Sequence, residues 1–180
     1  IDRLNQVVDD FLAFARPGEP ERGRAELVDI VEEVRELTDP QARDRGIHFE
    51  MKAEPGELIA EADPSQVSQV VLNLFLNAYQ AFDRLDDDRT PTVTVLSETR
   101  SLSGADYACL GIRDNAGGIP TEMREQIFDP YFTTRDDGTG LGLSVSSRIV
   151  DAHGGFIDLD VDDAEGTTTF WVCLSKSSDA

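Results

Sequence analysis

A cluster of glycines followed by a helical pattern constrains this chain more than any other feature. Gly138, Gly140 and Gly142 alternate over five positions, and an apolar-patterned segment follows them as far as Gly154 and Gly155. The first turn of a helix has unpaired backbone N–H groups and partial positive charge, and glycines let oxygen atoms approach the backbone, so the arrangement suits phosphate. The stretch lacks the lysine of a P-loop and the preceding strand of a dinucleotide fingerprint. The glycines alone leave two interpretations open, a phosphate-binding loop and a flexible connection.

The composition favours one soluble domain. Hydrophobic side chains make up 39% of the 180 residues, which is enough for one sizeable core. No apolar run approaches the roughly 20 residues that cross a bilayer, and no signal-peptide pattern opens the sequence, so we expect a soluble, unprocessed chain without a membrane segment. The net charge of -20 repels nucleic acids and anionic membranes, so we expect no nucleic-acid partner. Cys109 and Cys173 lie in alternating apolar runs, and we expect them to be buried, reduced thiols.

The N-terminal segment predicts the end of a longer helix that packs in a bundle or coiled coil. Its apolar residues follow a three-four spacing: Ile1, Leu4, Val8, Phe11 and Ala15. An amphipathic helix folded onto the domain's own core is the alternative. The stretch RPGEP at 16–20 ends this helix with two prolines and a glycine. We expect residues 1–16 to be helical, 17–21 to be a linker, 22–176 to form one domain and 177–180 to be a tail.

The rest of the chain mixes helices and strands. The patterns predict helices at 26–46, 63–83, 121–127 and 141–152, and strands at 47–53, 91–98, 106–113, 156–161 and 167–174. The helix at 63–83 begins with DPSQ, which supplies an N-cap acceptor at Asp63, a proline at the first helical position and a glutamine at the third, a capping-box arrangement. Because strands and helices do not alternate regularly, we predict an α+β fold, a two-layer α/β sandwich with helices on one face of a mixed sheet.

Two groups of polar residues indicate a binding site. Asn73 and Asn77 are four residues apart, hence on one helix face, and they interrupt an apolar run. Buried amides are costly unless paired, so they cap neighbouring backbone or face a ligand cavity. The amide oxygen of Asn77 suits Mg²⁺, which prefers hard oxygen ligands. In the stretch DNAGGIP, Asp114 can accept a hydrogen bond from an exocyclic amine, and Gly118 lets a flat ring lie close.

Together with the aromatic stretch IFDPYFTTR at 127–135, these segments resemble the N, G1, F and G2 boxes of sensor histidine kinases. That family belongs to the Bergerat-fold group, which includes gyrase, mismatch-repair and heat-shock chaperone ATPases. The stretch RLNQVVDDFLAFARP resembles the end of the second dimerisation helix in kinases of the nitrogen-regulation type. The resemblance covers nearly the whole chain and implies a Bergerat ATP-binding domain over 22–176, preceded by a helical remnant.

The resemblance also implies the site and its cofactors, ATP and Mg²⁺. Asn73 and Asn77 would be the catalytic residues, with Asn77 as the magnesium ligand and Asn73 as a polar support near the phosphates. Asp114 would select adenine, and Thr168 would approach the adenine through water. The implied ATP-binding residues are Asn73, Asn77, Asp114, Gly118, Ile119, Phe132, Thr139, Gly140, Leu141, Gly142, Leu143 and Thr168.

Two positions depart from the family pattern. Ala116 stands where many members have the first glycine of the G1 box, which is tolerable if its φ is not positive. Gln80 replaces a basic residue that some relatives place after the magnesium asparagine, and Arg135 or Arg148 are the candidates to substitute for it.

The resemblance implies phosphoryl transfer to a histidine. ATPases of the group carry a glutamate four residues before the magnesium asparagine, where it serves as a general base, whereas this chain has Asn73, which has no useful basicity. An ATPase of the group and a nucleotide-binding module without transfer activity stay open as alternatives. His48 and His153 lack the family's phosphoacceptor motif, so we expect both to be structural.

The chain therefore resembles the ATP-binding catalytic domain of a two-component sensor histidine kinase. Its implied substrate is a histidine on a dimerisation domain of the same kinase, outside this sequence. A downstream response regulator and a second copy of the full-length protein, in a homodimer, are the other implied partners. The implied location is the cytoplasm, and a membrane anchor in the parent kinase stays open.

Overall fold

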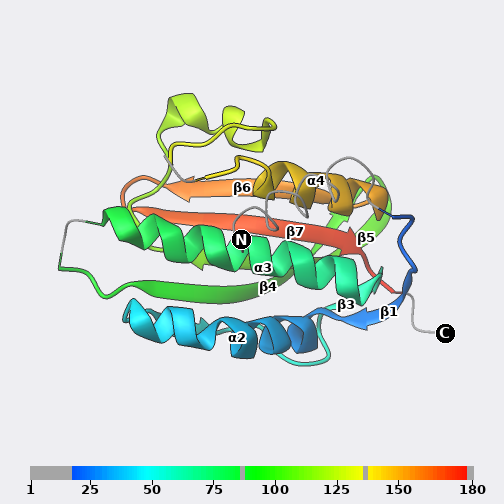
Figure 1. Ribbon diagram of the computed structural model, residues 1–180. Helices are drawn as coiled ribbons and strands as arrows, with labels where there is room; N and C mark the ends of the chain where they lie inside the picture. The colour runs from blue at the N-terminus through cyan, green and yellow to red at the C-terminus, as the bar shows by residue number, and fades with distance from the viewer. Residues whose placement is uncertain (1–17, 86–87, 136–137, 178–180) are drawn as a thin grey trace.

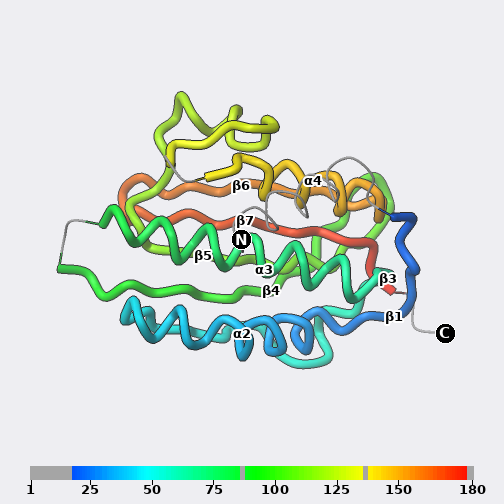
Figure 2. Tube along the Cα trace, in the orientation of Figure 1, coloured from blue at the N-terminus to red at the C-terminus, as the bar shows by residue number. Residues whose placement is uncertain are grey.

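The computed structural model describes residues 18–85, 88–135 and 138–177, which form a layer of helices packed on a sheet (Figures 1 and 2). The predicted helix at 1–16 lies outside the described residues. The helices are α2 (Leu27–Asp44), α3 (Pro64–Ala81) and α4 (Gly142–Ala152), and the 3₁₀ turns are η1 (Phe82–Arg84), η2 (Thr121–Met123) and η3 (Gln126–Phe128). The strands are β1 (Gly23–Glu26), β2 (His48–Met51), β3 (Ile59–Ala62), β4 (Thr92–Leu102), β5 (Ala105–Asp114), β6 (Phe156–Asp162) and β7 (Thr167–Ser175).

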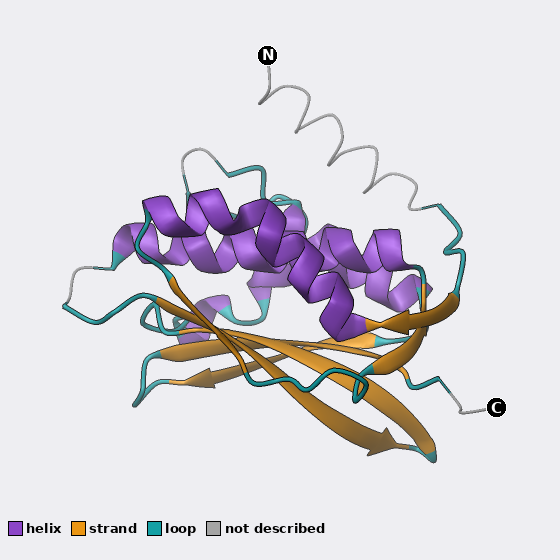
Figure 3. Cartoon of the chain, turned by 90° about the horizontal axis from the view of Figure 1, so that it is seen from below, coloured by secondary structure: helices purple, strands orange, loops and turns teal. Residues whose placement is uncertain are grey.

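The large sheet is mixed and has the strand order β2-β4-β5-β7-β6. β2 runs parallel to β4, and the other neighbouring pairs are antiparallel. Figure 3 shows α2, α3 and α4 together on one face of this sheet. The predicted α+β sandwich is thereby confirmed. The sequence patterns missed β1 and β3, which pair with each other in a small antiparallel sheet, because each strand has only four residues.

The start of α3 follows from its sequence. The carboxylate of Asp63 accepts hydrogen bonds from the backbone N–H groups of Ser65 and Gln66, and Pro64 occupies the first helical position, as predicted. Gln66 does not complete the capping box, because its Oε1 accepts no hydrogen bond from the described residues, while its Nε2 donates to the carbonyl of Gly18. The backbone N–H of Asp63 donates instead to Nε2 of His153. This bond ties the first turn of α3 to the end of α4.

The main core lies between the sheet and the helices. Successive residues of a strand point to opposite faces, so one set from β5 faces the helices and the intervening set faces away. The core-facing set of β5 consists of Ala108, Leu110 and Ile112, and Asp114 continues that row. From the helix layer, α3 contributes Val67, Val70, Val71, Leu74, Phe75 and Ala78. The periodicity of the core therefore directs Asp114 toward the helix layer, at the end of an apolar row.

The expectation of reduced thiols is wrong, because Cys109 and Cys173 form a disulfide. The two residues are directly opposite each other on antiparallel β5 and β7, with their Cα atoms 4.1 Å apart. They lie on the face of the sheet away from the helices, beside Trp171. Gly111 makes room for the indole, since a Cβ there would lie 2.7 Å from its ring. The pairing depends on the register of strands that are far apart in sequence, so the apolar runs could not predict it.

The stretch before β1 is bonded to the ends of two helices. Besides the bond from Gln66 to Gly18, the N–H of Glu21 donates to Asp63 at 3.0 Å, and the guanidinium of Arg22 donates to the carbonyl of Ala152 at 2.6 Å. The part of the predicted linker that the structure describes therefore lies against the start of α3, and Arg22, which follows it, is bonded to the end of α4. Over the described residues, none of the helices has both the length and the apolar character needed to cross a membrane.

Candidate functional site

The glycine-rich loop is folded tightly before α4. The N–H of Tyr131 donates to the carbonyl of Gly140 at 2.8 Å, and a Cβ on Gly140, which has a φ of +66°, would lie 2.4 Å from the carbonyl carbon of Tyr131. Only glycine fits this position. α4 starts at Gly142 without a side-chain cap from Leu141, the residue at its N-cap. Its first turn therefore offers backbone N–H groups to an anion.

Two asparagines of α3 face this loop. The Nδ2 of Asn73 lies 3.3 Å from both the carbonyl oxygen of Gly142 and the Oγ of Ser146. Asn73 thus links the middle of α3 to the first turn of α4. The Nδ2 of Asn77 is buried and has no hydrogen-bond partner among the described residues. A buried polar group without a partner costs about 1–3 kcal/mol, so this N–H is a candidate to donate to an acceptor atom of a ligand.

Asp114 lies at the end of the core-facing row of β5. Its Cα pairs with that of Thr168 on β7, and the two residues are 6% and 3% exposed. Burial raises the pKa of the Asp114 carboxyl to about 6, and the N–H of Ala116, which donates to it at 2.9 Å, lowers that pKa in part. The carboxyl is therefore ionised above neutral pH and accepts one backbone hydrogen bond. Ala116 does not have a positive φ, which is the condition under which it can replace glycine here.

Two adjoining cavities lie between α3, the glycine-rich loop and the segment before it. One, of about 400 Å³, is lined by Asn73, Asn77, Phe132, Thr139, Gly140, Gly142 and Leu143 among the predicted residues. The other, of about 460 Å³, is lined by Asn77, Gly118, Ile119, Phe132 and Leu143 among them. The structure thus brings most of the predicted residues around one hollow region. Asp114, Leu141 and Thr168 are buried and do not line either cavity.

The cations at these cavities were only partly predicted. Arg135 and Gln80 line both cavities, whereas Arg148 lines neither. Arg84 lines the 460 Å³ cavity and was not predicted, although it follows Gln80 by four residues, one helical turn. That spacing places Arg84 on the same helical face as Gln80 and could have identified it from the sequence. Of the described side chains, two arginines from different segments therefore surround the cavity next to Asn77.

The histidines lie elsewhere. His153 is 1% exposed, and its Nδ1 lies 2.7 Å from the carbonyl of Ile149 while its Nε2 accepts from the N–H of Asp63. This pattern requires a neutral ring that links α3 to α4. His48 is exposed on β2. Neither histidine lines the two cavities.

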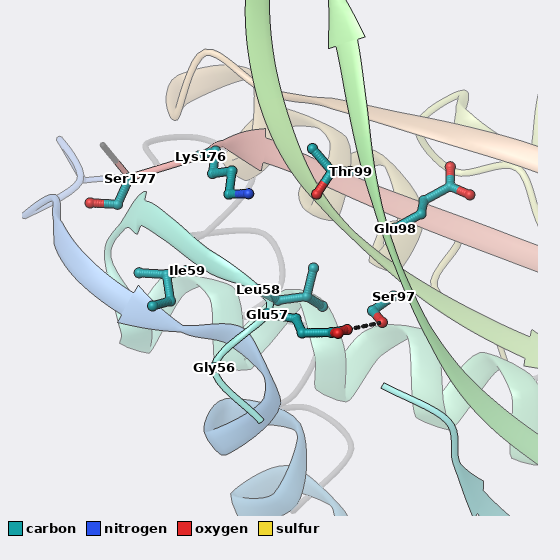
Figure 4. Close-up of a pocket in the computed structure, with 9 residues that line it drawn as sticks. All are labelled: Gly56, Glu57, Leu58, Ile59, Ser97, Glu98, Thr99, Lys176 and Ser177. Atoms are coloured by element: carbon teal, nitrogen blue, oxygen red, sulfur yellow. Dashed lines mark hydrogen bonds between the residues drawn. The ribbon is translucent and has the colours of Figure 1, made fainter. Parts of the chain in front are cut away.

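A separate cavity of about 380 Å³ lies beside the middle of β4, at Ser97–Thr99 (Figure 4). It is lined by both acidic and basic side chains, including Glu57, Glu98 and Lys176. A hydrogen bond of 3.3 Å from Ser97 to Glu57 crosses it. No residue predicted for the site lines this cavity, and its chemistry does not favour a particular ligand.

Comparisons with known proteins agree with this arrangement. The family described as histidine kinase-, DNA gyrase B- and HSP90-like ATPase matches residues 62–178. Sensor histidine kinase ZraS of Escherichia coli K12 is 36% identical over 172 residues, which are 95% of this chain and 35% of that protein. Sensory histidine kinase/phosphatase NtrB of Vibrio alginolyticus is 34% identical over 178 residues, 96% of this chain and 49% of that protein. The chain therefore spans between a third and a half of the length of these relatives.

Solved structures show the same fold. The catalytic domain of histidine kinase ThkA superposes with a TM-score of 0.69 and 30% identity, over 87% of this chain and 96% of that chain. A longer ThkA structure, in complex with response regulator protein TrrA, gives a TM-score of 0.77 and 27% identity over 98% of this chain and 48% of that chain.

Proposed function

Because this chain belongs to the family of histidine kinase-, DNA gyrase B- and HSP90-like ATPases, we propose that it binds Mg-ATP and transfers the γ-phosphate to a histidine of a dimerisation domain. The resemblance predicted from the sequence is confirmed, since the relatives named above are sensor histidine kinases and the fold is that of a histidine kinase catalytic domain. The observation that carries the choice of reaction is the amide of Asn73 bonded to Gly142.

Asn73 decides between transfer and hydrolysis. ATPases of the group, by the resemblance, have a glutamate here that activates water. In this chain the side chain is an amide whose N–H groups point to the carbonyl of Gly142 and to Ser146, so it holds the phosphate loop and offers no base. Slow hydrolysis and transfer to an outside imidazole are therefore the reactions that the site supports. The imidazole nitrogen forms a bond to the γ-phosphorus as the bond from that phosphorus to the bridging oxygen breaks, and ADP leaves.

Residues in and beside the two cavities suit different parts of the nucleotide. The glycine-rich loop and the first turn of α4 bind the phosphates through backbone N–H groups. Asp114 is proposed to accept from the exocyclic amine of adenine, with Thr168 beside it and Gly118 under the ring. Asn77 would hold Mg²⁺, because it lines both cavities and its amide oxygen is a hard ligand of the kind that Mg²⁺ prefers. The bound ion would neutralise charge on the phosphates.

The partners follow from the proposed reaction. We propose that residues 1–16 end a dimerisation helix, that 17–21 link it to the catalytic domain at 22–176, and that 177–180 form a tail. The full-length protein would be a homodimer in the cytoplasm that passes its phosphoryl group to a response regulator, as the pairing of ThkA with TrrA supports. His153 is buried and His48 lines neither cavity, so we propose that the acceptor lies outside this chain.

Transfer of labelled γ-phosphate tests the proposal. With Mg-ATP alone, the chain should form no acid-labile, base-stable phosphoprotein and should release phosphate slowly. Mixed with a separately made dimerisation domain that carries the acceptor histidine, it should label that domain, inefficiently because the two are not tethered. Rapid phosphate release without an acceptor would assign the chain to the ATPases. Nucleotide binding without transfer or release would leave a binding module.

A further inference from the structure

Arg84 binds the segment that precedes the glycine-rich loop. It ends η1, directly after α3, and its guanidinium donates to the Oγ of Thr134 at 2.8 Å and also to the carbonyl oxygen of Thr134. The two bonds come from separate guanidinium nitrogens and engage one residue, which fixes the backbone as well as the side chain. Arg84, just after α3, and Thr134 are therefore joined at the 460 Å³ cavity, which both residues line.

The neighbours of Thr134 line the proposed nucleotide site. Thr133 and Arg135 each contribute to both cavities, together with Asn77. The same segment is held at its start by the bond from the N–H of Tyr131 to Gly140. Residues 131–135 are thus held by two backbone hydrogen bonds to the glycine-rich loop, from Tyr131 to Gly140 and from the N–H of Gly138 to the carbonyl of Arg135, and by the contact with Arg84.

Arg84 is available for this contact because the acidic residue beside it is engaged elsewhere. Asp83 pairs with Arg45 at the end of α2, with 3.1 Å between the Nε of Arg45 and a carboxylate oxygen of Asp83. Gln80, one turn earlier on α3, supplies no charge. The cationic groups near Asn77 in the 460 Å³ cavity are therefore Arg84 and Arg135, and the first holds the segment that carries the second.

We propose that Arg84 is a positioning residue, which holds residues 133–135 against the end of α3 and thereby places Arg135 beside the bound polyphosphate. The inference rests on the proposed function, since it assumes that a nucleotide occupies these cavities. It assigns to Arg84 an indirect role through Thr134, distinct from direct contact with the nucleotide.

The first experiment is hydrogen exchange of the backbone at 131–135 in the nucleotide-free protein, so that its result does not depend on nucleotide binding. Arg84→Ala should raise the exchange rate of this segment about threefold or more, because local opening no longer breaks two hydrogen bonds. Arg43→Ala is the matched control, since it removes the same charge from an exposed pair with Asp39 and should leave the segment unchanged. Unchanged exchange in Arg84→Ala would overturn the proposal.

Affinity measurements separate the indirect role from a direct one. Arg84→Ala should weaken Mg-ATP about threefold to tenfold and AMP much less, with an unchanged unfolding midpoint. Thr134→Val, which leaves Arg84 in place but removes one of its acceptors, should weaken Mg-ATP in the same direction by a smaller factor. Arg84→Lys should restore part of both the affinity and the slow exchange. Two results would contradict the proposal by showing that Arg84 contacts the nucleotide directly. One is full Mg-ATP affinity together with fast exchange at 131–135 in Arg84→Lys, and the other is unchanged Mg-ATP affinity in Thr134→Val. Absence of nucleotide binding by the unaltered protein would refute the proposed function and the role of Arg84 in it, whereas the exchange experiment would still test the contact itself.

Discussion

Replacing Asp114 by asparagine is expected to stabilise the domain at pH 8 and to weaken its binding of adenine nucleotides. Asp114 is 6% exposed, and burial raises the pKa of its carboxyl from the ordinary 3.8 to about 6. An acid with a higher pKa in the folded state favours folding when protonated, so that benefit is complete below pH 3.8 and is lost as the pH rises through about 6. At 1.36 kcal/mol per pKa unit, the ionised carboxyl lowers the free energy of unfolding by about 3 kcal/mol at pH 8 and about 1.5 kcal/mol at pH 5.

Asparagine is uncharged and so avoids the cost of burying an ionised carboxyl, but the gain in the free energy of unfolding is smaller than that cost. Its amide oxygen can accept from the N–H of Ala116 as the carboxylate does, whereas its Nδ2 gains no partner in the nucleotide-free protein. We therefore expect Asp114→Asn to be about 1–2 kcal/mol more stable than the unaltered chain at pH 8. Urea unfolding at pH 8 and pH 5 measures this difference, which should shrink by about 1.5 kcal/mol at the lower pH.

Nucleotide binding should change in the opposite direction. A charge-assisted hydrogen bond to the adenine amine contributes roughly 1.5–3 kcal/mol, so ATP affinity should fall by about tenfold or more. Calorimetry with ATP and GTP checks the selectivity. A variant that is no more stable at pH 8, or whose stability difference is the same at both pH values, would refute the reasoning from burial. Unchanged ATP affinity in the folded variant would refute the role in adenine binding.

Three further perturbations test other parts of the structure. Asn77→Ala should weaken the binding of Mg-ATP at least about tenfold but that of magnesium-free ATP little, since only the proposed metal ligand is lost; equal weakening of both by calorimetry would assign Asn77 to the fold. Asn73→Asp should lower the free energy of unfolding by about 1–3 kcal/mol, because an oxygen replaces the donor to Gly142, and an unchanged urea midpoint would contradict this. Reduction of the Cys109–Cys173 bridge should lower the free energy of unfolding by about 4 kcal/mol, given the sequence separation of 64, without altering nucleotide affinity. The same urea midpoint before and after verified reduction would count against that estimate.

Local sequence patterns predicted most of the elements because each pattern is long enough to repeat. The apolar spacing through 64–81 specifies a helix with one buried face. Apolar residues alternate in parts of β4 and β5, and β7 contains a continuous apolar run at 170–174. The short strands β1 and β3 do not repeat and were missed. Their pairing is settled by tertiary contact, which periodicity does not encode.

The candidate site was predictable where a motif is continuous and less so where distant segments meet. The glycines around Gly140 and the asparagines of α3 carry their chemistry within a few residues. The bond from Arg84 to Thr134 and the disulfide from Cys109 to Cys173 join segments separated by 50 and 64 residues, so they depend on how the elements pack. The burial of Asp114 likewise follows from its place at the end of a core row, which only the sheet register fixes.

The bonds at Gly18, Glu21 and Arg22 give the helix layer a mechanical property. α4 has 11 residues and is about 16 Å long, with the glycine-rich loop at one end and the carbonyl to which Arg22 donates at the other. The same stretch of chain is hydrogen-bonded to the start of α3, and Asn73 links α3 to α4 near the glycine-rich loop. Figure 1 shows the start of α3, the end of α4 and the strand β1 gathered at one side of the molecule. A displacement of the backbone at Gly18 would therefore reach Gly142 by two routes, along α4 and through the first half of α3 to Asn73.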